Sequence, residues 1–273
     1  MAVLRLTLRD GIGYEIEDNG ASAEKTAVFL HGFTGSAKTW DETDEHFRGI
    51  RLIKLNLLGH GKTDSPADNQ RYTTEQQAAD LLEIFDLLKL KKVDLVGYSM
   101  GGRLALSFAM MHPERVSGLV LESSSPGLQT EEERRSRRDQ DARLGERIIN
   151  EGIESFVDYW EQIPLFASQL SLEASKRKKI REERLSNNPT GLAGSLAGMG
   201  TGSQPSWWDK LDDITFPVLL IAGSLDKKFV AINQNMHRKI PGSRLVIAEQ
   251  TGHAVHVEEP DFFGKIVSEF IFK

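Results

Sequence analysis

The stretch GYSMGGR, residues 97–103, decides the fold of this 273-residue chain. It contains the pattern Gly-x-Ser-x-Gly, in which a serine, here Ser99, occupies a sharp turn between a strand and a helix. Backbone segments crowd together at such a turn, and Gly97 and Gly101 supply residues without a Cβ atom. Arg103 follows the serine by about one helical turn, roughly 6 Å along the helix axis. The stretch therefore predicts a reactive serine with a guanidinium close by.

Short apolar runs recur along the chain and alternate with segments of helical periodicity. The expected strands contain residues 27–30, 52–55, 93–96, 119–121, 218–221 and 245–247, and the expected helices span 37–48, 74–90, 100–112, 229–240 and 261–271. Continuous apolar strands that alternate with helices are typical of a parallel sheet buried on both faces. Residues 5–8 and 13–17 flank an Asp-Gly turn signal and predict an N-terminal β-hairpin.

The pattern changes between residues 124 and 210, where no strong strand signal occurs. This segment contains charged amphipathic helices at 130–150 and 172–187, a short helix at 153–160 and a glycine-rich stretch at 191–202. We therefore expect a core domain made of residues 1–123 and 211–273. Residues 124–210 would be inserted into it as a helical cap.

The composition is that of an ordinary soluble globular protein, with 39% hydrophobic and 27% charged residues. The net charge of −6 argues against general nucleic-acid binding. No run reaches the roughly 18 apolar residues of a membrane span, and charges interrupt the N-terminal stretch where a signal peptide would be apolar. The absence of cysteine excludes disulfides, thiolate metal sites and cysteine nucleophiles. We expect a cytoplasmic protein, with no membrane partner and no cofactor requirement.

A serine hydroxyl becomes reactive only with a base, a group that orients that base, and donors for developing negative charge. The chain places one candidate after each of three expected strands. Ser99 follows the strand at 93–97, Asp226 the strand at 218–223, and His253 the strand at 245–248. The order Ser, Asp, His is the one expected of the α/β-hydrolase arrangement. We therefore predict a catalytic triad of these three residues.

The donors for negative charge are expected in HGFTG, residues 31–35, which directly follows the strand at 26–30. Its glycines allow backbone N–H groups to turn toward the serine. The predicted oxyanion pair is the amide of Phe33 and the amide of Met100, the residue after the serine. His31 itself is expected to make structural hydrogen bonds.

His256 and Glu258 follow His253 at a spacing that fits no usual metal motif. We expect them to make structural hydrogen bonds, and we expect no metal site.

Residues 26–122 and 211–273 resemble the α/β-hydrolase superfamily. The segment NLLGHGKT, residues 56–63, is similar to the D-x-P-G-H-G-x-S segment of that superfamily and departs from it at Asn56 and Leu58. Because the segment is structural in most members, this departure leaves the triad prediction unchanged.

Several arginines raise the question of an anionic ligand. The candidates are Arg134, Arg137 and Arg138 on one expected helix, Arg181 and Arg184 on the next, and Arg103. The simpler interpretation of the cap arginines is a solvated helix face with i,i+4 ion pairs. The position of Arg103 favours a carboxylate ligand, because arginine binds carboxylates bidentately and a partly desolvated pair contributes about 1.5–3 kcal/mol.

Further segments narrow the resemblance. They are GYSMGGR at 97–103, ESSSPGL at 122–128, Trp160, PLF at 164–166, RLSN at 184–187 and GTGSQPSWW at 200–208. Together they resemble the 2-succinyl-6-hydroxy-2,4-cyclohexadiene-1-carboxylate synthases of menaquinone biosynthesis, over nearly the whole chain. The resemblance implies a lyase that eliminates pyruvate from a small polycarboxylate, 2-succinyl-5-enolpyruvyl-6-hydroxy-3-cyclohexene-1-carboxylate, with the serine as general base.

The same resemblance implies the residues that bind the substrate. They are the carboxylate-binding arginines Arg103, Arg137 and Arg184, with Arg138 and Arg181 as competitors for the last two positions, and the pocket residues Tyr98 and Trp160. The residues alone also allow a serine hydrolase, either an esterase or a carbon–carbon bond hydrolase. A silent binding protein of the same fold is disfavoured because all three triad residues are present.

Overall fold

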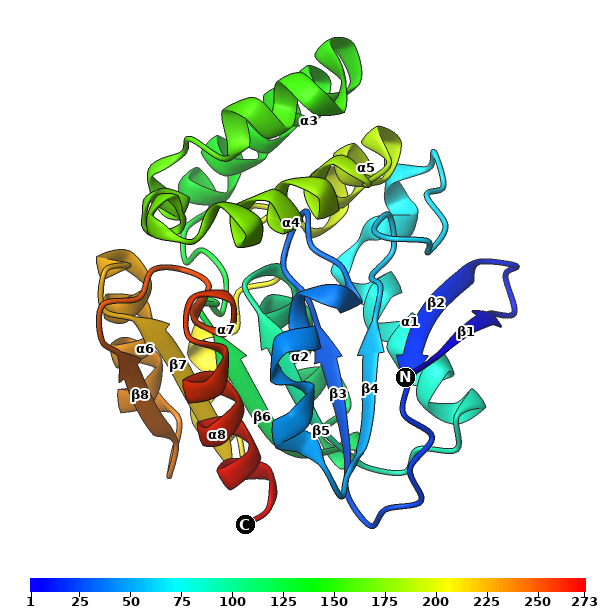
Figure 1. The fold of residues 1–273 in the computed structure, drawn as a ribbon, viewed down its shortest axis with the longest axis vertical. Helices are drawn as coiled ribbons and strands as arrows, with labels where there is room; N and C mark the ends of the chain where they lie inside the picture. Colours follow the sequence, from blue (N-terminus) through cyan, green and yellow to red (C-terminus); the bar gives the residue numbers. More distant parts are fainter.

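The computed structural model describes residues 1–273 and contains one eight-stranded sheet in the order β1-β2-β4-β3-β5-β6-β7-β8 (Figure 1). The strands are β1 (Ala2–Thr7), β2 (Gly13–Asp18), β3 (Thr26–Leu30), β4 (Arg51–Leu55), β5 (Val93–Tyr98), β6 (Val116–Glu122), β7 (Val218–Gly223) and β8 (Arg244–Ala248). The hairpin β1–β2 is antiparallel and joins β4 antiparallel, whereas β3 to β8 are parallel. The predicted mostly parallel sheet and its N-terminal hairpin are confirmed.

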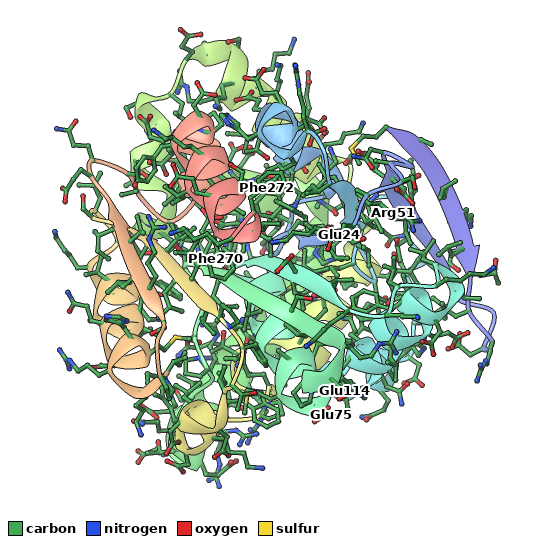
Figure 2. The ribbon with its side chains drawn as sticks, turned by 90° about the horizontal axis from the view of Figure 1, so that it is seen from below. Glu24, Arg51, Glu75, Glu114, Phe270 and Phe272 are labelled. Atoms are coloured by element: carbon green, nitrogen blue, oxygen red, sulfur yellow. The ribbon has the colours of Figure 1, made fainter.

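Helices cover both faces of the sheet, as the view from below shows (Figure 2). They are η1 (Ala37–Phe47), η2 (Asn69–Tyr72), α1 (Thr74–Leu87), α2 (Met100–Met111), η3 (Pro113–Arg115), α3 (Glu131–Trp160), η4 (Pro164–Ser171), α4 (Ala174–Leu185), α5 (Pro189–Met199), η5 (Trp208–Asp213), α6 (Lys227–Lys239), α7 (Val255–Glu258) and α8 (Pro260–Ile271). Helices η1 and α8 pack on one face, and α1, α2 and α6 on the other. None of the helices combines the length and the apolar character needed to cross a bilayer.

Strand β5 shows why the strands read as continuous apolar runs. Successive side chains of a strand point to opposite faces. Val93 and Leu95 therefore join the hydrophobic core on the side of α1 and α2, whereas Val96 and Tyr98 join the core on the side of η1 and α8. Both faces are buried, so apolar residues are favoured on either face of the strand, and Asp94 is the exception in β5.

The expected helix at 37–48 is a 3₁₀ helix, η1. Its buried residues include Ala37, Trp40 and Thr43, which are spaced by three. That spacing matches the period of a 3₁₀ helix, about 3.0 residues per turn, and places all three side chains on the core side.

The helices α3, η4, α4 and α5 lie within the segment expected as a cap, and Figure 1 shows α3, α4 and α5 above the upper end of the sheet. The short helix η5 crosses the expected end of the cap at residue 210. Gly152 interrupts α3 with φ 83° and ψ 171°, so this element consists of the two helices that the sequence predicts. The division into core and cap at residues 124 and 210 remains our proposal.

The helix α5 occupies the glycine-rich stretch, whose periodicity does not predict it. Asn188 caps this helix by accepting hydrogen bonds from the N–H groups of Thr190 and Gly191, and Pro189 occupies its first turn. A Cβ atom on Gly194 or Gly198 would overlap Tyr72. These glycines therefore allow close packing of the helix and do not indicate a flexible loop.

The first turn of α2 lies directly against the end of β3. A Cβ atom on Gly101 would overlap the carbonyl oxygens of Leu30 and His31, and one on Gly97 would lie 2.5 Å from the carbonyl oxygen of Gly101. The turn at Ser99 thus exists only because both positions lack a side chain.

We predict that Gly101→Ala lowers the free energy of unfolding by about 1–3 kcal/mol, because the overlapping atoms belong to the backbone. The matched control is Gly145→Ala, also a helical glycine, whose Cβ would have its nearest neighbour at 3.6 Å. That change should be neutral or stabilise the fold by about 0.5–1 kcal/mol. Chemical denaturation of both variants measures the difference, and equal effects would contradict the packing argument.

Candidate active site

Ser99 occupies a strained turn between β5 and α2. Its backbone has φ 49° and ψ −105°, outside the regions that residues with a side chain prefer. The N–H of Ser99 donates to the carbonyl of Glu122 (2.8 Å), and its carbonyl accepts from the N–H of Arg103 (3.0 Å). Neighbouring strands and the helix therefore hold the turn in place, as expected where strain serves a function.

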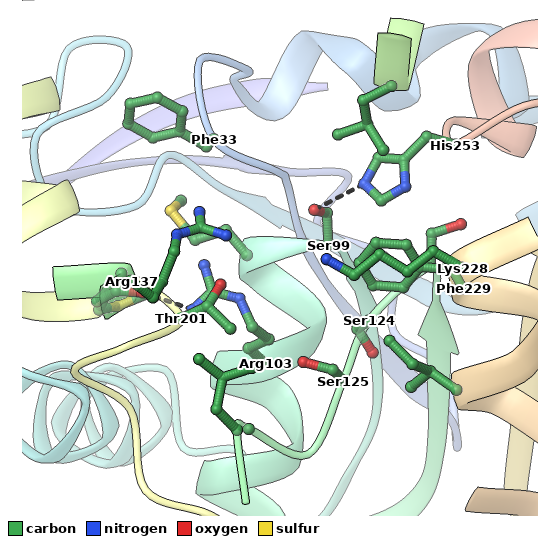
Figure 3. A pocket seen from close by; sticks show the side chains of 18 of the residues that line it. Phe33, Ser99, Arg103, Ser124, Ser125, Arg137, Thr201, Lys228, Phe229 and His253 are labelled. Carbon is green, nitrogen blue, oxygen red and sulfur yellow. Dashed lines mark hydrogen bonds between the residues drawn. The ribbon is translucent and has the colours of Figure 1, made fainter. Parts of the chain in front are cut away.

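The three predicted triad residues lie in one hydrogen-bonded row, and Figure 3 shows the contact between Ser99 and His253. The distance from Ser99 Oγ to His253 Nε2 is 3.0 Å, and that from His253 Nδ1 to Asp226 Oδ2 is 2.7 Å. A carboxylate only accepts, so Nδ1–H donates to Asp226 and Nε2 is free to accept the serine proton. The second carboxylate oxygen of Asp226 accepts from the N–H of Phe229, which fixes Asp226 at the start of α6. The geometry is that of a serine paired with a base.

The predicted oxyanion donors belong to residues of the same cavity as Ser99. Phe33 and Met100 line the cavity at Ser99, and neither backbone N–H donates a hydrogen bond to another group of the chain. Two free amide N–H groups in the same cavity as a serine hydroxyl can donate to a substrate oxygen and stabilise the negative charge that develops on it.

The cavity at Ser99 has a volume of about 660 Å³. Its lining contains three permanent cations, Arg103, Arg137 and Lys228, and one carboxylate, Glu133. The wall is therefore positive, although the chain as a whole carries a net charge of −6. A cavity of this size suits a small ligand, and its charge favours an anionic one.

Arg103 projects from α2 into the cavity (Figure 3). Its guanidinium donates to two neutral acceptors, the carbonyl of Met199 at 2.6 Å and Oε1 of Gln204 at 2.8 Å. Burial, together with the positive charge of Arg137, lowers the pKa of Arg103 to about 10. The group is still charged at neutral pH and touches no carboxylate, so a ligand carboxylate would relieve its burial cost.

The first cap helix separates the competing arginines. Arg137 lines the cavity, and its Nε donates to Asp141 Oδ1 at 2.8 Å. Arg138 donates to the carbonyl of Gly202 at 3.0 Å, and Arg134 Nε lies 3.5 Å from the same oxygen; neither lines the cavity. Of the three candidates on this helix, only Arg137 therefore faces Ser99.

Arg184 does not line the Ser99 cavity. It lies behind the ring of Phe166, with its guanidinium carbon 4.7 Å from the ring centroid, and donates to Gln169 at 3.0 Å. Its competitor Arg181 binds Asp158 and Glu161 and is also outside the cavity. The structure thus brings two of the three expected arginines to the serine.

The pocket residues Tyr98 and Trp160 both line the cavity. The indole N–H of Trp160 is buried without a hydrogen-bond partner in the chain, and its ring packs against Phe33 at 5.5 Å between centroids. Because this nitrogen is itself buried, a ligand oxygen would reach it only after a shift of the surrounding side chains.

Lys228 and Gln204 were not predicted from the sequence. Lys228 lines the cavity and follows the triad candidate Asp226 by two residues, on the first turn of α6. Its place next to the expected acid is the one signal that the sequence offers. Gln204 accepts from Arg103 and belongs to the segment 200–208 that carries part of the family resemblance. That segment did not indicate the role of this residue.

His256 and Glu258 each make hydrogen bonds to other residues of the core. His256 binds the buried carboxylate of Glu122 at 2.8 Å, and Glu258 accepts from the N–H of Gly252 at 2.7 Å.

Two buried histidines support the loop that carries Phe33. The N–H of Leu57 donates to His31 Nε2 at 3.0 Å, so His31 Nδ1–H donates to the carbonyl of Gly32 at 2.8 Å. His60 lies 5.0 Å from His31 between ring centroids, and its Nε2 has no partner. Burial lowers the pKa of His31 to about 3 and the pKa of His60 to about 4. Both rings are therefore neutral at physiological pH.

Residues 26–260 match the family described as "alpha/beta hydrolase fold". The chain is 55% identical over 271 residues, 99% of each chain, to a Bacillus subtilis (strain 168) protein that provisionally carries the name 2-succinyl-6-hydroxy-2,4-cyclohexadiene-1-carboxylate synthase. The chain belongs to this synthase family. It is also 33% identical over 242 residues to the synthase of the same name from Salmonella typhimurium, covering 88% of this chain and 91% of that one.

A solved structure of the family has the same fold. The structure of MenH from S. aureus superposes with a TM-score of 0.90 at 37% identity, over 95% of this chain and 97% of that one. The predicted family and the α/β-hydrolase fold class are therefore confirmed.

The buried histidines give the fold a pH dependence. Below about pH 6.5 the unfolded chain binds a proton at His60 that the folded chain does not bind until about pH 4. Stability is therefore lost as the pH falls, and His60 alone accounts for about 2 kcal/mol between pH 7 and pH 5.

We predict that His60→Asn, which cannot titrate, loses about 2 kcal/mol less stability than the natural chain over this range. Urea denaturation at several pH values measures the difference. The exposed His237 provides the control, because His237→Asn should leave the pH dependence unchanged. Parallel pH profiles for the natural chain and His60→Asn would contradict the argument.

Proposed function

We propose that this chain is the lyase of menaquinone biosynthesis that eliminates pyruvate from 2-succinyl-5-enolpyruvyl-6-hydroxy-3-cyclohexene-1-carboxylate. The product would be 2-succinyl-6-hydroxy-2,4-cyclohexadiene-1-carboxylate. One observation supports the proposal above all. The hydrogen-bonded residues Ser99, His253 and Asp226 lie at a cavity lined by cations, in a chain that belongs to the synthase family. No cofactor enters the proposed reaction.

The charge of the cavity suits this substrate. The substrate carries three carboxylates, one on the ring, one on the succinyl arm and one on the enolpyruvyl group. Arg103 and Arg137 would bind carboxylates, and Lys228 adds a third positive charge in the same wall. Tyr98 and Trp160 would pack against the ring. A bidentate arginine–carboxylate pair fixes orientation as well as position.

In the proposed mechanism Ser99 acts as a general base. Its Oγ removes the ring proton next to the succinyl ketone while its own proton passes to His253 Nε2, 3.0 Å away. The electron pair of the broken C–H bond forms one new ring double bond, the existing double bond shifts, and the C–O bond to the enolpyruvyl group breaks. The leaving group takes up a proton and becomes pyruvate.

The other site residues would stabilise the charges that this step creates. Asp226 holds the His253 ring in one tautomer and stabilises it when it becomes protonated. The amides of Phe33 and Met100 would donate to the ketone oxygen as it becomes an enolate. In this scheme the serine never bonds to carbon, so no acyl-enzyme forms.

We predict that the natural chain releases one pyruvate per molecule of substrate, together with the absorbance of a conjugated diene. Ser99→Ala should lower kcat by about 10²–10⁴-fold, the usual contribution of general base catalysis. It should leave KM nearly unchanged, because the cationic wall is intact. A lactate dehydrogenase-coupled assay measures pyruvate, and an unchanged kcat would rule out the proposed role of Ser99.

Mass spectrometry of the enzyme during turnover separates elimination from hydrolysis. A serine hydrolase would accumulate an acylated Ser99 with an activated ester, whereas the lyase scheme requires the unmodified mass with its own substrate. A covalent intermediate during pyruvate release would overturn the general-base mechanism.

We further predict that Arg103→Ala lowers kcat/KM by tenfold to 150-fold, the loss of about 1.5–3 kcal/mol of carboxylate binding. The matched control is Arg134→Ala, a cap arginine outside the cavity, which should change kcat/KM less than threefold. Steady-state kinetics of both variants decide the matter. Similar losses in the two would show that Arg103 does not contact the substrate.

A further inference from the structure

The turn that carries His253 has little regular structure of its own. It connects β8, which ends at Ala248, to the four-residue helix α7. Yet the ring of His253 must stay within hydrogen-bond reach of Ser99, and a displacement of about 1 Å at such a site can lower the rate 10²-fold. Something outside the backbone of the turn must hold it.

Glu258 binds the turn on the N-terminal side of His253. Its Oε2 accepts from the N–H of Gly252 at 2.7 Å, directly before the histidine. Its Oε1 accepts from Ser168 Oγ at 2.9 Å, on the cap element η4. A Cβ atom at Gly252 would overlap Ser168, so the cap rests directly on this turn. One carboxylate therefore connects the cap with the backbone next to His253.

Glu122 binds the turn on the C-terminal side of His253. Its carboxylate accepts from the N–H of His256 at 3.0 Å and from His256 Nδ1 at 2.8 Å, and both side chains are fully buried. The backbone carbonyl of the same residue accepts from the N–H of Ser99 at 2.8 Å. Glu122 thus ties the end of the histidine turn to the serine turn.

We propose that Glu258 and Glu122 are positioning residues that clamp the His253 turn from both sides and so set the distance between His253 and Ser99. The proposal rests on the proposed function of that pair. Neither glutamate lines the Ser99 cavity, so both act through the histidine and not on the substrate. Through Ser168 the clamp also includes the cap, which makes the position of the cap part of the geometry of the base.

The test compares Glu258→Ala and Glu258→Gln with Glu259→Ala. Glu259 is the adjacent glutamate, and its exposed side chain makes no hydrogen bond or ion pair in the structure. We expect Glu258→Ala to lower kcat tenfold to a hundredfold with KM within twofold of the natural chain. Glu258→Gln keeps an acceptor for Gly252 and an amide that can bind Ser168, so it should retain kcat within about threefold. Glu259→Ala should change neither constant.

If Glu258→Gln keeps the kcat that Glu258→Ala loses, and KM is unchanged in both, the loss comes from the position of His253 and not from lower stability of the fold. Equal kcat values for Glu258→Ala and Glu259→Ala would overturn the proposal, as would a loss confined to KM. Pyruvate release by the natural chain is measured in the same assay. If the natural chain is inactive, the proposed function fails; if it is active and Glu258→Ala is too, only the clamp fails.

A second variant keeps the test decisive if Glu258→Ala does not fold, as judged by circular dichroism. Ser168→Ala leaves Glu258 and the turn in place and removes only the bond between cap and clamp. We expect a twofold to tenfold lower kcat at unchanged KM. An unchanged kcat in this variant would contradict the inclusion of the cap in the clamp.

Discussion

The contact between the first turn of α2 and the end of β3 is the constraint on which the rest of the site depends. A Cβ atom on Gly101 would overlap the backbone of Leu30 and His31, and one on Gly97 would overlap the backbone of Gly101 and Gly102, so neither position can carry a side chain. This approach forces Ser99 into a positive φ angle and leaves the N–H of Met100 without an acceptor in the chain. The same helix then carries Arg103 into the cavity one turn later. The strained backbone of Ser99, the free N–H of Met100 and the position of Arg103 thus all depend on the packing of this turn.

Electrostatics gives this common fold a particular ligand preference. A chain of net charge −6 repels a polycarboxylate at long range, and screening limits that repulsion to about 8–10 Å at ordinary salt. Inside the cavity the short-range field is positive, because three cations face one carboxylate there. Arg103 hydrogen-bonds only to neutral oxygens and Arg137 shares its charge with Asp141, so the wall retains positive charge for a ligand. The site therefore selects by local arrangement and not by overall charge.

Most of the core was predictable from the sequence because its signals are local. Apolar runs mark buried strands, and residues that follow parallel strands meet at one edge of the sheet, which is why Ser99, Asp226 and His253 could be placed together. The cap was harder. Helix α5 escaped prediction because its glycines serve close packing on Tyr72, a contact between segments far apart in the chain. Lys228 lines the cavity from the first turn of α6, and Gln204 contacts Arg103 from a loop. No local pattern predicts either contact.

Arg184 shows where a resemblance in sequence stops short of geometry. Its guanidinium is largely buried, donates to Gln169 and lies against one face of Phe166. Phe166 lines the Ser99 cavity, and its ring centroid is 6.2 Å from that of His253. Phe166 therefore contributes to the cavity wall while Arg184 lies against that ring and outside the lining. A sequence motif shows which residue is present, here Arg184, but the side chain that packs against it, here Phe166, belongs to another element. Whether a charged side chain faces a ligand is decided by such neighbours, which the sequence of the motif does not contain.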